Sequence, residues 1–131
     1  MSVYVVRFHD EVTLKPTPAL GVLLGTVQHA TQVFQEDWIV TCGSEGHGPG
    51  DSHTLGEALD LSVSAWNPEQ VVQRYHWLVA QTGPLFYVQY ERPDDSPSWE
   101  LNAIAVINPA ASAPHIHMQR RKGTVYPPVS P

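Results

Sequence analysis

Histidine and acidic side chains stand at regular intervals in two stretches of this 131-residue sequence. Residues 50–61 read GDSHTLGEALDL and contain His53 and Asp60, and residues 114–119 read PHIHMQ and contain His115 and His117. Two imidazoles and one carboxylate suit zinc as three protein ligands, and they leave a fourth position for water. This pattern is typical of catalytic zinc sites, because structural zinc sites are normally closed by four protein ligands.

The later histidine pair lies in a segment that predicts a strand over residues 115–120. Residues two apart on a strand point to the same face, so both imidazoles would stand side by side on a sheet. Taken alone, His115 and His117 favour a simpler interpretation, a solvent-facing pair on an edge strand. The metal hypothesis therefore depends on the earlier stretch.

The earlier stretch predicts a strand over residues 57–63 that carries Asp60 on one face. The leucines on either side of Asp60 share the other face and predict a core beneath it. Gly56 allows the backbone to turn back, so that His53 on the preceding loop can meet Asp60. The alternative is that Asp60 satisfies a backbone group and that His53 is an ordinary loop residue.

The rest of the chain predicts the elements that must position these side chains. The pattern predicts strands over residues 3–8, 37–43, 57–63, 85–91, 99–107 and 115–120, and helices over residues 18–35 and 68–82. Thr17 before Pro18, and Asn67 before Pro68, are typical N-caps followed by proline at the first helical position. Two principal helices with strands grouped late indicate an α+β domain with a mainly antiparallel sheet.

Composition indicates one globular domain spanning residues 1–131, with a short proline-rich C-terminal tail. Hydrophobic residues make up 42% of the chain and charged residues 15%. A net charge of −6 argues against nucleic acid or an anionic membrane as a partner. The one basic cluster, at residues 120–122, is interpreted as a solvated strand end. The single cysteine, Cys42, excludes an internal disulfide and a zinc cage with several thiolates.

The N-terminus shows no secretory signal pattern, and no segment has the length needed to span a bilayer. We therefore expect a protein that is cytoplasmic when synthesised and does not insert into membranes. Work outside the cell would follow lysis or another export route.

The stretch IVTCGSEGHGPGDSHTLGEALDL, followed by PHIHM, resembles the zinc D-alanyl-D-alanine metallopeptidases. This family contains carboxypeptidases and phage peptidoglycan endolysins, and it shares a core with the lysostaphin and hedgehog domains. Its signatures are Ser-x-His-x-x-Gly-x-Ala-x-Asp and a later His-x-His, and VTCG resembles the VTSG that ends a preceding strand. The matching residues are His53, Gly56, Ala58, Asp60, His115 and His117. Asp51 stands where the signature has serine, and Cys42 replaces the serine of VTSG.

The order of the predicted elements extends the resemblance over about residues 17–120. The resemblance implies a single zinc peptidase-like domain with that core, a hedgehog or D-Ala-D-Ala peptidase-like fold, and a zinc-dependent hydrolase acting on peptidoglycan. It implies that His53, Asp60 and His117 bind Zn²⁺. His115 would orient the substrate or stabilise the developing oxyanion. The implied substrate is a short peptide containing D-amino acids, such as the peptidoglycan stem peptide, cleaved by a carboxypeptidase or an endopeptidase. His47 lies where phage relatives often show a histidine, and it receives no role.

The sequence leaves the identity of the general base undecided. The family often has a glutamate shortly before the metal histidine, but the residues before His115 read NPAASAP and contain no acid. Glu91 is our predicted base, because a glutamate closes a similar strand in phage relatives. The alternative is that Glu91 pairs with Arg92 or caps a loop, and Glu100 is a second candidate for the base.

Two other functions remain open from the sequence. Without a base, the chain would be a catalytically inactive metal-binding domain that recognises a peptide or a partner protein, as the hedgehog domain illustrates. The third possibility is an α+β domain that binds no metal and merely exposes its histidines.

Overall fold

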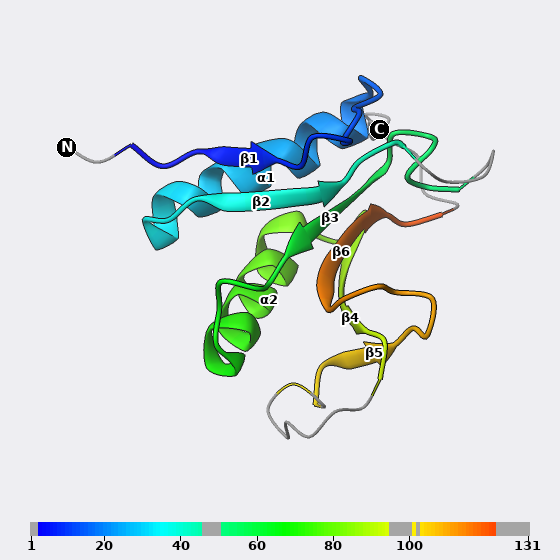
Figure 1. Ribbon diagram of the computed structural model, residues 1–131. Coiled ribbons are helices and arrows are strands. Elements are labelled where there is room, and N and C mark those ends of the chain that lie inside the picture. The colour runs from blue at the N-terminus through cyan, green and yellow to red at the C-terminus, as the bar shows by residue number, and fades with distance from the viewer. Residues whose placement is uncertain (1–2, 46–50, 95–100, 102, 123–131) are drawn as a thin grey trace.

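The computed structural model describes residues 3–45, 51–94, 101 and 103–122. The elements within these residues are two helices and six strands, whose arrangement can be followed in Figure 1. In chain order they are β1 (Val6–Phe8), α1 (Pro18–Phe34), β2 (Trp38–Cys42), β3 (Ala58–Ser62), α2 (Pro68–Thr82), β4 (Phe86–Arg92), β5 (Ala105–Ile107) and β6 (His115–Arg120). The predicted α+β class with two principal helices is confirmed.

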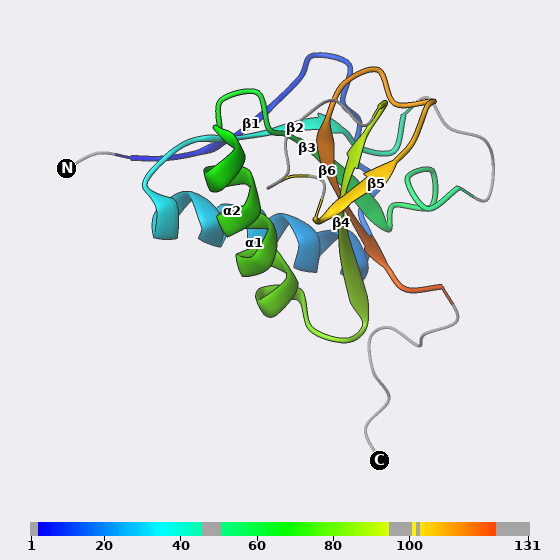
Figure 2. The same ribbon diagram turned by 90° about the horizontal axis from the view of Figure 1, so that it is seen from below.

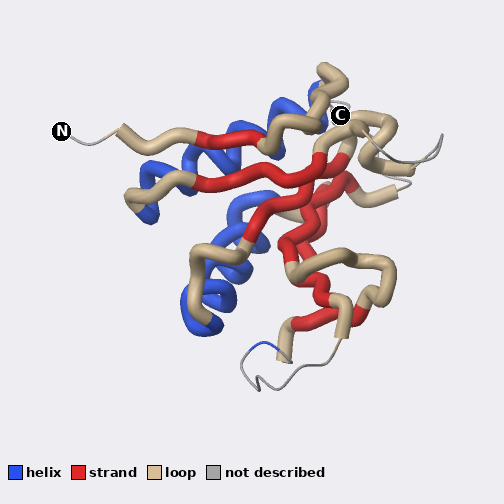
Figure 3. Tube along the Cα trace, in the orientation of Figure 1, coloured by secondary structure: helices blue, strands red, loops and turns tan. Residues whose placement is uncertain are grey.

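The six strands form one mixed sheet in the order β1-β2-β3-β6-β4-β5 (Figure 3). The pairings of β2 with β3, β3 with β6 and β6 with β4 are antiparallel. The outer pairings of β1 with β2 and of β4 with β5 are parallel. The last strand in the sequence therefore lies in the middle of the sheet, between β3 and β4.

Both helices pack on the same side of the sheet, as the two views in Figures 1 and 2 show. The core lies between the helices and that face of the sheet. It contains Leu20, Leu23, Val27, Val40, Leu59, Leu61, Leu78, Val88, Ile116 and Met118, among others. No helix among the described residues is long and apolar enough to span a membrane.

The helix caps follow the predicted chemistry. Thr17 Oγ1 accepts the backbone N–H of Leu20 at 3.0 Å and donates to the carbonyl of Gly56 at 2.6 Å. The N-terminus of α1 is thereby joined to the loop that precedes β3. Asn67 and Gln70 form a reciprocal capping box at the start of α2.

The predicted strand over residues 99–107 is wrong in its first part among the described residues. Ala103 and Ile104 form a turn, in which the N–H of Ile104 donates to the carbonyl of Leu101 at 3.0 Å. Of the predicted strand, only the last three residues are extended. They form β5, which pairs with the last three residues of β4. β1 is likewise shorter than predicted, since it pairs only with residues 38–40 of β2.

The antiparallel register sets side chains in rows across the face of the sheet that lies opposite the helices. Alternation on each strand sends one set of residues into the core and the other set to this face. Three rows follow from the register: Ala58, Gln119 and Tyr87; then Asp60, His117 and Gln89; then Ser62, His115 and Glu91. The fold therefore brings both signatures of the sequence onto one surface.

Candidate functional site

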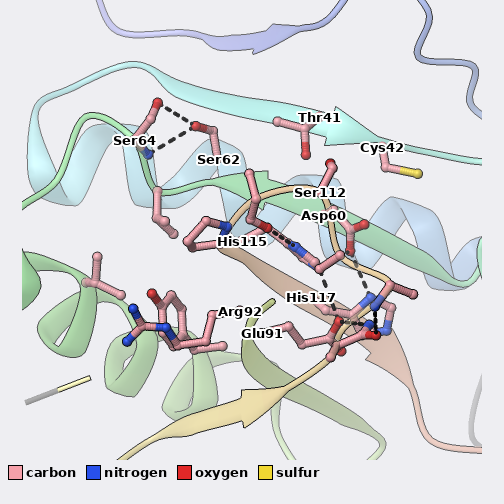
Figure 4. Close-up of a pocket in the computed structure, with 18 of the residues that line it drawn as sticks. Thr41, Cys42, Asp60, Ser62, Ser64, Glu91, Arg92, Ser112, His115 and His117 are labelled. Carbon is pink, nitrogen blue, oxygen red and sulfur yellow. Dashed lines mark hydrogen bonds and ion pairs between the residues drawn. The ribbon is translucent and has the colours of Figure 1, made fainter. Parts of the chain in front are cut away.

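Three donor atoms converge in the middle row of this face (Figure 4). Nδ1 of His117 lies 2.8 Å from Oδ1 of Asp60 and 3.2 Å from Nε2 of His53. Nε2 of His53 lies 3.4 Å from the same carboxylate oxygen. Both histidines are buried and Asp60 is partly buried. Residues that are 64 positions apart in the sequence thus place three potential metal ligands within contact of one another.

Each imidazole of His53 and His117 has a second hydrogen bond, on the ring nitrogen that faces away from the cluster, and this bond sets the orientation of the ring. Nδ1 of His53 lies 2.9 Å from the backbone carbonyl of Gly43, and a carbonyl can only accept a hydrogen bond. Nδ1 therefore carries the proton in neutral His53, and Nε2 points its lone pair at the cluster. Nε2 of His117 lies 2.8 Å from Oε1 of Gln119, which leaves Nδ1 facing Asp60. Three lone-pair atoms then meet at one point, an arrangement that a cation or a proton must neutralise.

The loop geometry explains how His53 reaches Asp60. Gly56 has a φ of +73° and turns the chain into β3, as the sequence predicts. The side chain of Asp51 accepts the backbone N–H of His53 at 2.9 Å, which fixes the start of the loop. The acid in the position of the signature serine therefore orders the loop that holds His53.

The row beside the cluster of His53, Asp60 and His117 holds a histidine–carboxylate pair. Nε2 of His115 lies 3.2 Å from Oε1 of Glu91 and 3.7 Å from Oδ1 of Asp60. Nδ1 of His115 faces the carbonyl of Ala113 at 3.1 Å, and Asn108 donates to Oε1 of Glu91 at 3.1 Å. Among the described residues, both hydrogen bonds of Glu91 end on the same oxygen.

The pKa shifts in this cluster favour an ionised Asp60 and a protonated His117. Burial opposes ionisation of Asp60, but hydrogen bonds from His117 and His53 outweigh it and hold the pKa of Asp60 well below its usual range. Burial lowers the pKa of His117, but the hydrogen bonds to Asp60 and Gln119 prevail and raise that pKa above its usual value. In the metal-free protein a proton therefore favours the place between His117 and Asp60.

The neighbouring pair is also ionised. Its hydrogen bond with His115 lowers the pKa of Glu91 despite partial burial of the carboxyl group. Burial acts to lower the pKa of His115, yet the Glu91 and Asp60 carboxylates raise it overall. These shifts favour a Glu91 carboxylate and a His115 imidazolium that can donate a hydrogen bond.

Cys42 joins the site through an irregularity that the sequence does not reveal. The register between β2 and β3 shifts between Val40 and Cys42, and this bulge places Cys42 opposite Asp60. Cys42, His53 and Asp60 each offer one ligand atom, and these atoms all lie within 4.8 Å of one another, so the group could hold a metal ion. Burial, followed by the nearby Asp60 carboxylate, strongly raises the pKa of the Cys42 thiol. Nδ1 of His117 lies 2.8 Å from Oδ1 of Asp60 and 3.2 Å from Nε2 of His53, so His117 offers a further donor beside this group.

Other predicted residues have clear places. His117 is buried and β6 is an inner strand, so the alternative of a solvent-facing pair on an edge strand is wrong. Glu91 contacts His115 and Asn108, whereas Arg92, the next residue on β4, is buried. Glu57 pairs with Arg120, away from the cluster. His47 and Glu100 lie outside the described residues.

Two hollows meet at the cluster. The main cleft has a volume of about 990 Å³ and is lined by His115, Glu91, Asp60 and, farther away, Trp66, Val71 and Leu101. A smaller hollow of about 450 Å³ is lined by Asp51, Ser52, His53, Tyr87, His117, Gln119, Arg121 and Lys122. His53 and His117 line both, so a ligand extending from one hollow to the other passes these two donors.

Comparisons of the chain with protein-family models, with curated proteins and with solved structures found no match. The arrangement of the chain's own residues therefore carries the functional conclusion.

Proposed function

We propose that the protein is a zinc-dependent peptidase that hydrolyses D-amino-acid-containing peptides of peptidoglycan. One observation carries the proposal. Nε2 of His53, Oδ1 of Asp60 and Nδ1 of His117 converge within 2.8–3.4 Å of one another on the wall of a cleft. The Glu91–His115 pair stands directly beside them.

The donor set fits zinc. Zinc bonds of about 2.0–2.2 Å in a tetrahedral arrangement separate the donor atoms by roughly 3.3–3.6 Å. Two of the three separations here, 3.2 Å and 3.4 Å, match this range closely. The third, 2.8 Å between His117 and Asp60, is a hydrogen-bond distance that belongs to a shared proton. Two imidazoles with one carboxylate also suit a borderline metal better than Ca²⁺ or Mg²⁺, which prefer oxygen ligands.

The residues have distinct roles in hydrolysis. When bound, zinc supplies Lewis acidity and lowers the pKa of water at its open position. Glu91 accepts a proton from the attacking water through its second oxygen, Oε2, and returns it to the leaving amine. His115 donates its Nε2–H toward the carbonyl oxygen on which negative charge develops. His53, Asp60 and His117 hold the metal, and Gly43 and Gln119 hold the two imidazoles in place.

The surroundings support a peptide substrate. The main cleft combines ionisable groups with the apolar side chains of Trp66, Val71 and Leu101, and it is large enough for several residues of an extended chain. The net charge of −6 disfavours nucleic acid as the ligand. In this proposal the stem peptide of peptidoglycan is the substrate, and the protein reaches it after release from the cell.

The fold supports the same family. The four inner strands, β2-β3-β6-β4, are joined by antiparallel pairings alone. We infer that these four strands, with both helices on one face, are a hedgehog or D-Ala-D-Ala peptidase-like core with parallel edge strands added.

The direct test is cleavage of stem peptides by zinc-loaded protein, followed by mass spectrometry of the products. We expect cleavage at a bond next to a D-amino acid, and we expect Asp60→Asn to abolish both zinc binding and cleavage. An exposed substitution, Glu69→Gln on α2, serves as the control for charge loss. A parent protein that bound zinc and cleaved no peptide would refute the peptidase proposal.

A second candidate function is a catalytically inactive metal-binding domain that recognises a peptide or partner protein. Cys42 favours it, because a thiolate beside His53 and Asp60 could supply a fourth protein ligand and close the site. The test uses cobalt in place of zinc. A thiolate–cobalt charge-transfer band that Cys42→Ser removes, together with weaker metal binding, would support the closed site. Unchanged metal affinity in Cys42→Ser would support the open, catalytic arrangement.

A further inference from the structure

We propose that Tyr87 is a positioning residue for the metal site, because it orients the Gln119 amide that in turn holds His117. The inference rests on the proposed zinc-dependent function and deepens it, since that function gives Tyr87 no role. Tyr87 lies opposite Gln119 in the row beside Asp60 and His117, and both Tyr87 and Gln119 line the smaller hollow. A residue that offers the metal no donor atom would thereby help to set the affinity for zinc.

The side-chain amide of Gln119 joins the imidazole of His117 to the phenol of Tyr87. Its Oε1 lies 2.8 Å from Nε2 of His117. A second hydrogen bond of Gln119 acts to lower the pKa of Tyr87, as an N–H that donates to the phenol oxygen does. Both contacts agree on one orientation of the amide, with its oxygen toward the imidazole and its nitrogen toward the phenol. An amide oxygen can only accept, so Nε2 of His117 carries a proton.

This orientation of the amide suits metal binding at the other ring nitrogen. Nδ1 of His117 lies 2.8 Å from Oδ1 of Asp60, at the cluster. Because Gln119 keeps a proton on Nε2, a metal replaces only the proton on Nδ1 and the outer hydrogen bond stays unchanged. With the amide reversed, its nitrogen would donate to Nε2, and neutral His117 would keep its single proton on Nδ1. A metal would then have to reverse both the tautomer and the amide.

Tyr87 is a well-held partner for this amide. The guanidinium carbon of Arg121 lies 5.6 Å from the centroid of the Tyr87 ring, a cation–π distance. Burial, followed by the Glu91 carboxylate, raises the pKa of Tyr87 overall, so the phenol stays neutral in near-neutral solution. A neutral phenol oxygen accepts the N–H of Gln119 and fixes which end of the amide faces the imidazole.

The test measures the Kd for zinc, by competition with a chelator, in variants that remove one contact at a time. Tyr87→Phe deletes only the phenol oxygen, and we expect the Kd to rise about tenfold. Gln119→Leu deletes both contacts of the amide and should raise the Kd by about 100-fold. Gln119→Glu keeps an acceptor for Nε2–H and should bind zinc at least as tightly as the parent. Tyr75→Phe, on α2 and lining neither hollow, is the matched control and should leave the Kd unchanged.

A double-mutant cycle separates an effect through Gln119 from a general loss of packing. If Tyr87 acts through the amide, Tyr87→Phe should raise the Kd for zinc in the parent and leave it unchanged in Gln119→Leu. An equal rise in both backgrounds would overturn the proposal. Nitrogen-15 NMR of the zinc-loaded protein gives a second readout. The proton on Nε2 of His117 should exchange with water at least tenfold faster in Tyr87→Phe than in the parent, and an unchanged exchange rate would also overturn the proposal.

Neither measurement requires turnover, so this inference and the peptidase proposal can fail separately. A parent that binds zinc and cleaves no peptide, with the expected order of Kd values, would uphold the role of Tyr87 and refute the peptidase. A parent that cleaves stem peptides, with Tyr87→Phe binding zinc as tightly as the parent, would overturn the role of Tyr87 and leave the peptidase proposal intact.

Discussion

Proton positions on the three site histidines decide what the cluster can bind. Backbone carbonyls face Nδ1 of His53 and Nδ1 of His115, and the side-chain oxygen of Gln119 faces Nε2 of His117. In their neutral forms His53 and His117 each direct a lone pair to the point where Oδ1 of Asp60 also lies, whereas His115 lies between two carboxylates. The first two histidines suit a metal, and His115 suits a positive charge that can meet a developing oxyanion.

One zinc per chain should bind through His53, Asp60 and His117. His53→Ala removes one of three protein ligands, and we expect metal content near one equivalent in the parent and near zero in the variant after dialysis. Elemental analysis of purified protein gives both numbers. His76→Ala, an exposed histidine on α2, should retain the parent's metal content. Full occupancy in His53→Ala would show that the ligand set is different.

Glu91 should act as the general base. Glu91→Gln keeps the shape of the side chain and removes its ability to accept a proton, so kcat should fall by about 10²–10⁴-fold. Zinc content should stay at the parent value, because Glu91 belongs to the row beside the ligands. The change in kcat is measured by timed assays on a stem peptide that the parent cleaves. Glu69→Gln is the surface control. A parent-like rate in Glu91→Gln would place the base at another residue.

Residue types and spacing predict the cluster of His53, Asp60 and His117 better than they predict the residues that support it. His53, Asp60 and His117 stand out because histidine and aspartate are costly to bury without partners. Gly43 and Gln119 do not stand out, because one acts through its backbone carbonyl and the other is an ordinary polar residue of a strand. Cys42 reaches the site through a bulge, and a one-residue shift in register has no signal in a single sequence.

At the scale of elements, the site depends on β6 lying between β3 and β4. Antiparallel pairing on both sides sets Asp60, His117 and Gln89 in line, and a slip of one residue would turn His117 into the core. The alternating apolar residues Ile116 and Met118 prevent this slip, since both are fully buried. The strands and helices themselves are predictable from periodicity and caps, but the position of β6 in the sheet is a long-range property.

Gly43 should be essential to the end of β2 for steric reasons. A Cβ at this position would lie 2.3 Å from the carbonyl oxygen of Thr13 and 3.1 Å from a methyl carbon of Leu14. Gly43→Ala must therefore displace backbone that also presents the acceptor for His53. We expect a loss of about 1–3 kcal/mol in the free energy of unfolding, with weaker zinc binding. Chemical denaturation and a zinc titration measure the two effects.

Gly21 offers a matched control for that substitution. It lies in α1, and a Cβ there would meet nothing within 4 Å. Gly21→Ala should raise the free energy of unfolding by roughly 0.5–1 kcal/mol, because alanine loses less entropy than glycine in a helix interior. Its zinc affinity should equal that of the parent. A stable Gly43→Ala variant with normal zinc affinity would contradict the proposed role of this strand end.

At the scale of the whole molecule, packing and chemistry occupy opposite faces of the sheet. The helices cover one face, where the buried guanidinium of Arg74 bonds Glu36 at 2.7 Å and 2.9 Å and lies 4.6 Å from the centroid of the Phe34 ring. The other face holds the site. The class of the fold could be predicted from two helices and late strands, but the parallel edge pairings could not. They depend on which edge each short strand reaches after a crossover.

The free energy of unfolding should depend on pH through the site residues when no metal is present. The pKa values of His115 and His117 are raised in the folded protein, so their contribution to stability is complete below about pH 6.5 and is lost as pH rises through the raised values. The pKa values of Asp60 and Glu91 are lowered, so their contribution is present above about pH 4 and is lost as pH falls through the lowered values. The metal-free cluster should therefore stabilise the fold most strongly in mildly acidic solution.

Bound zinc should offset the stability that the metal-free protein loses as pH rises. The metal must displace the proton that His117 shares with Asp60, so zinc binding should release protons and weaken as pH falls through the raised pKa of His117. Near pH 8, free zinc at a thousand times its Kd would stabilise the fold by about 4 kcal/mol and raise the Tm by on the order of 10 °C. Melting curves with and without zinc from pH 5 to pH 8 should diverge as pH rises, and those of His53→Ala should coincide throughout. A zinc-induced shift in Tm that stayed constant across this range would exclude imidazole ligation.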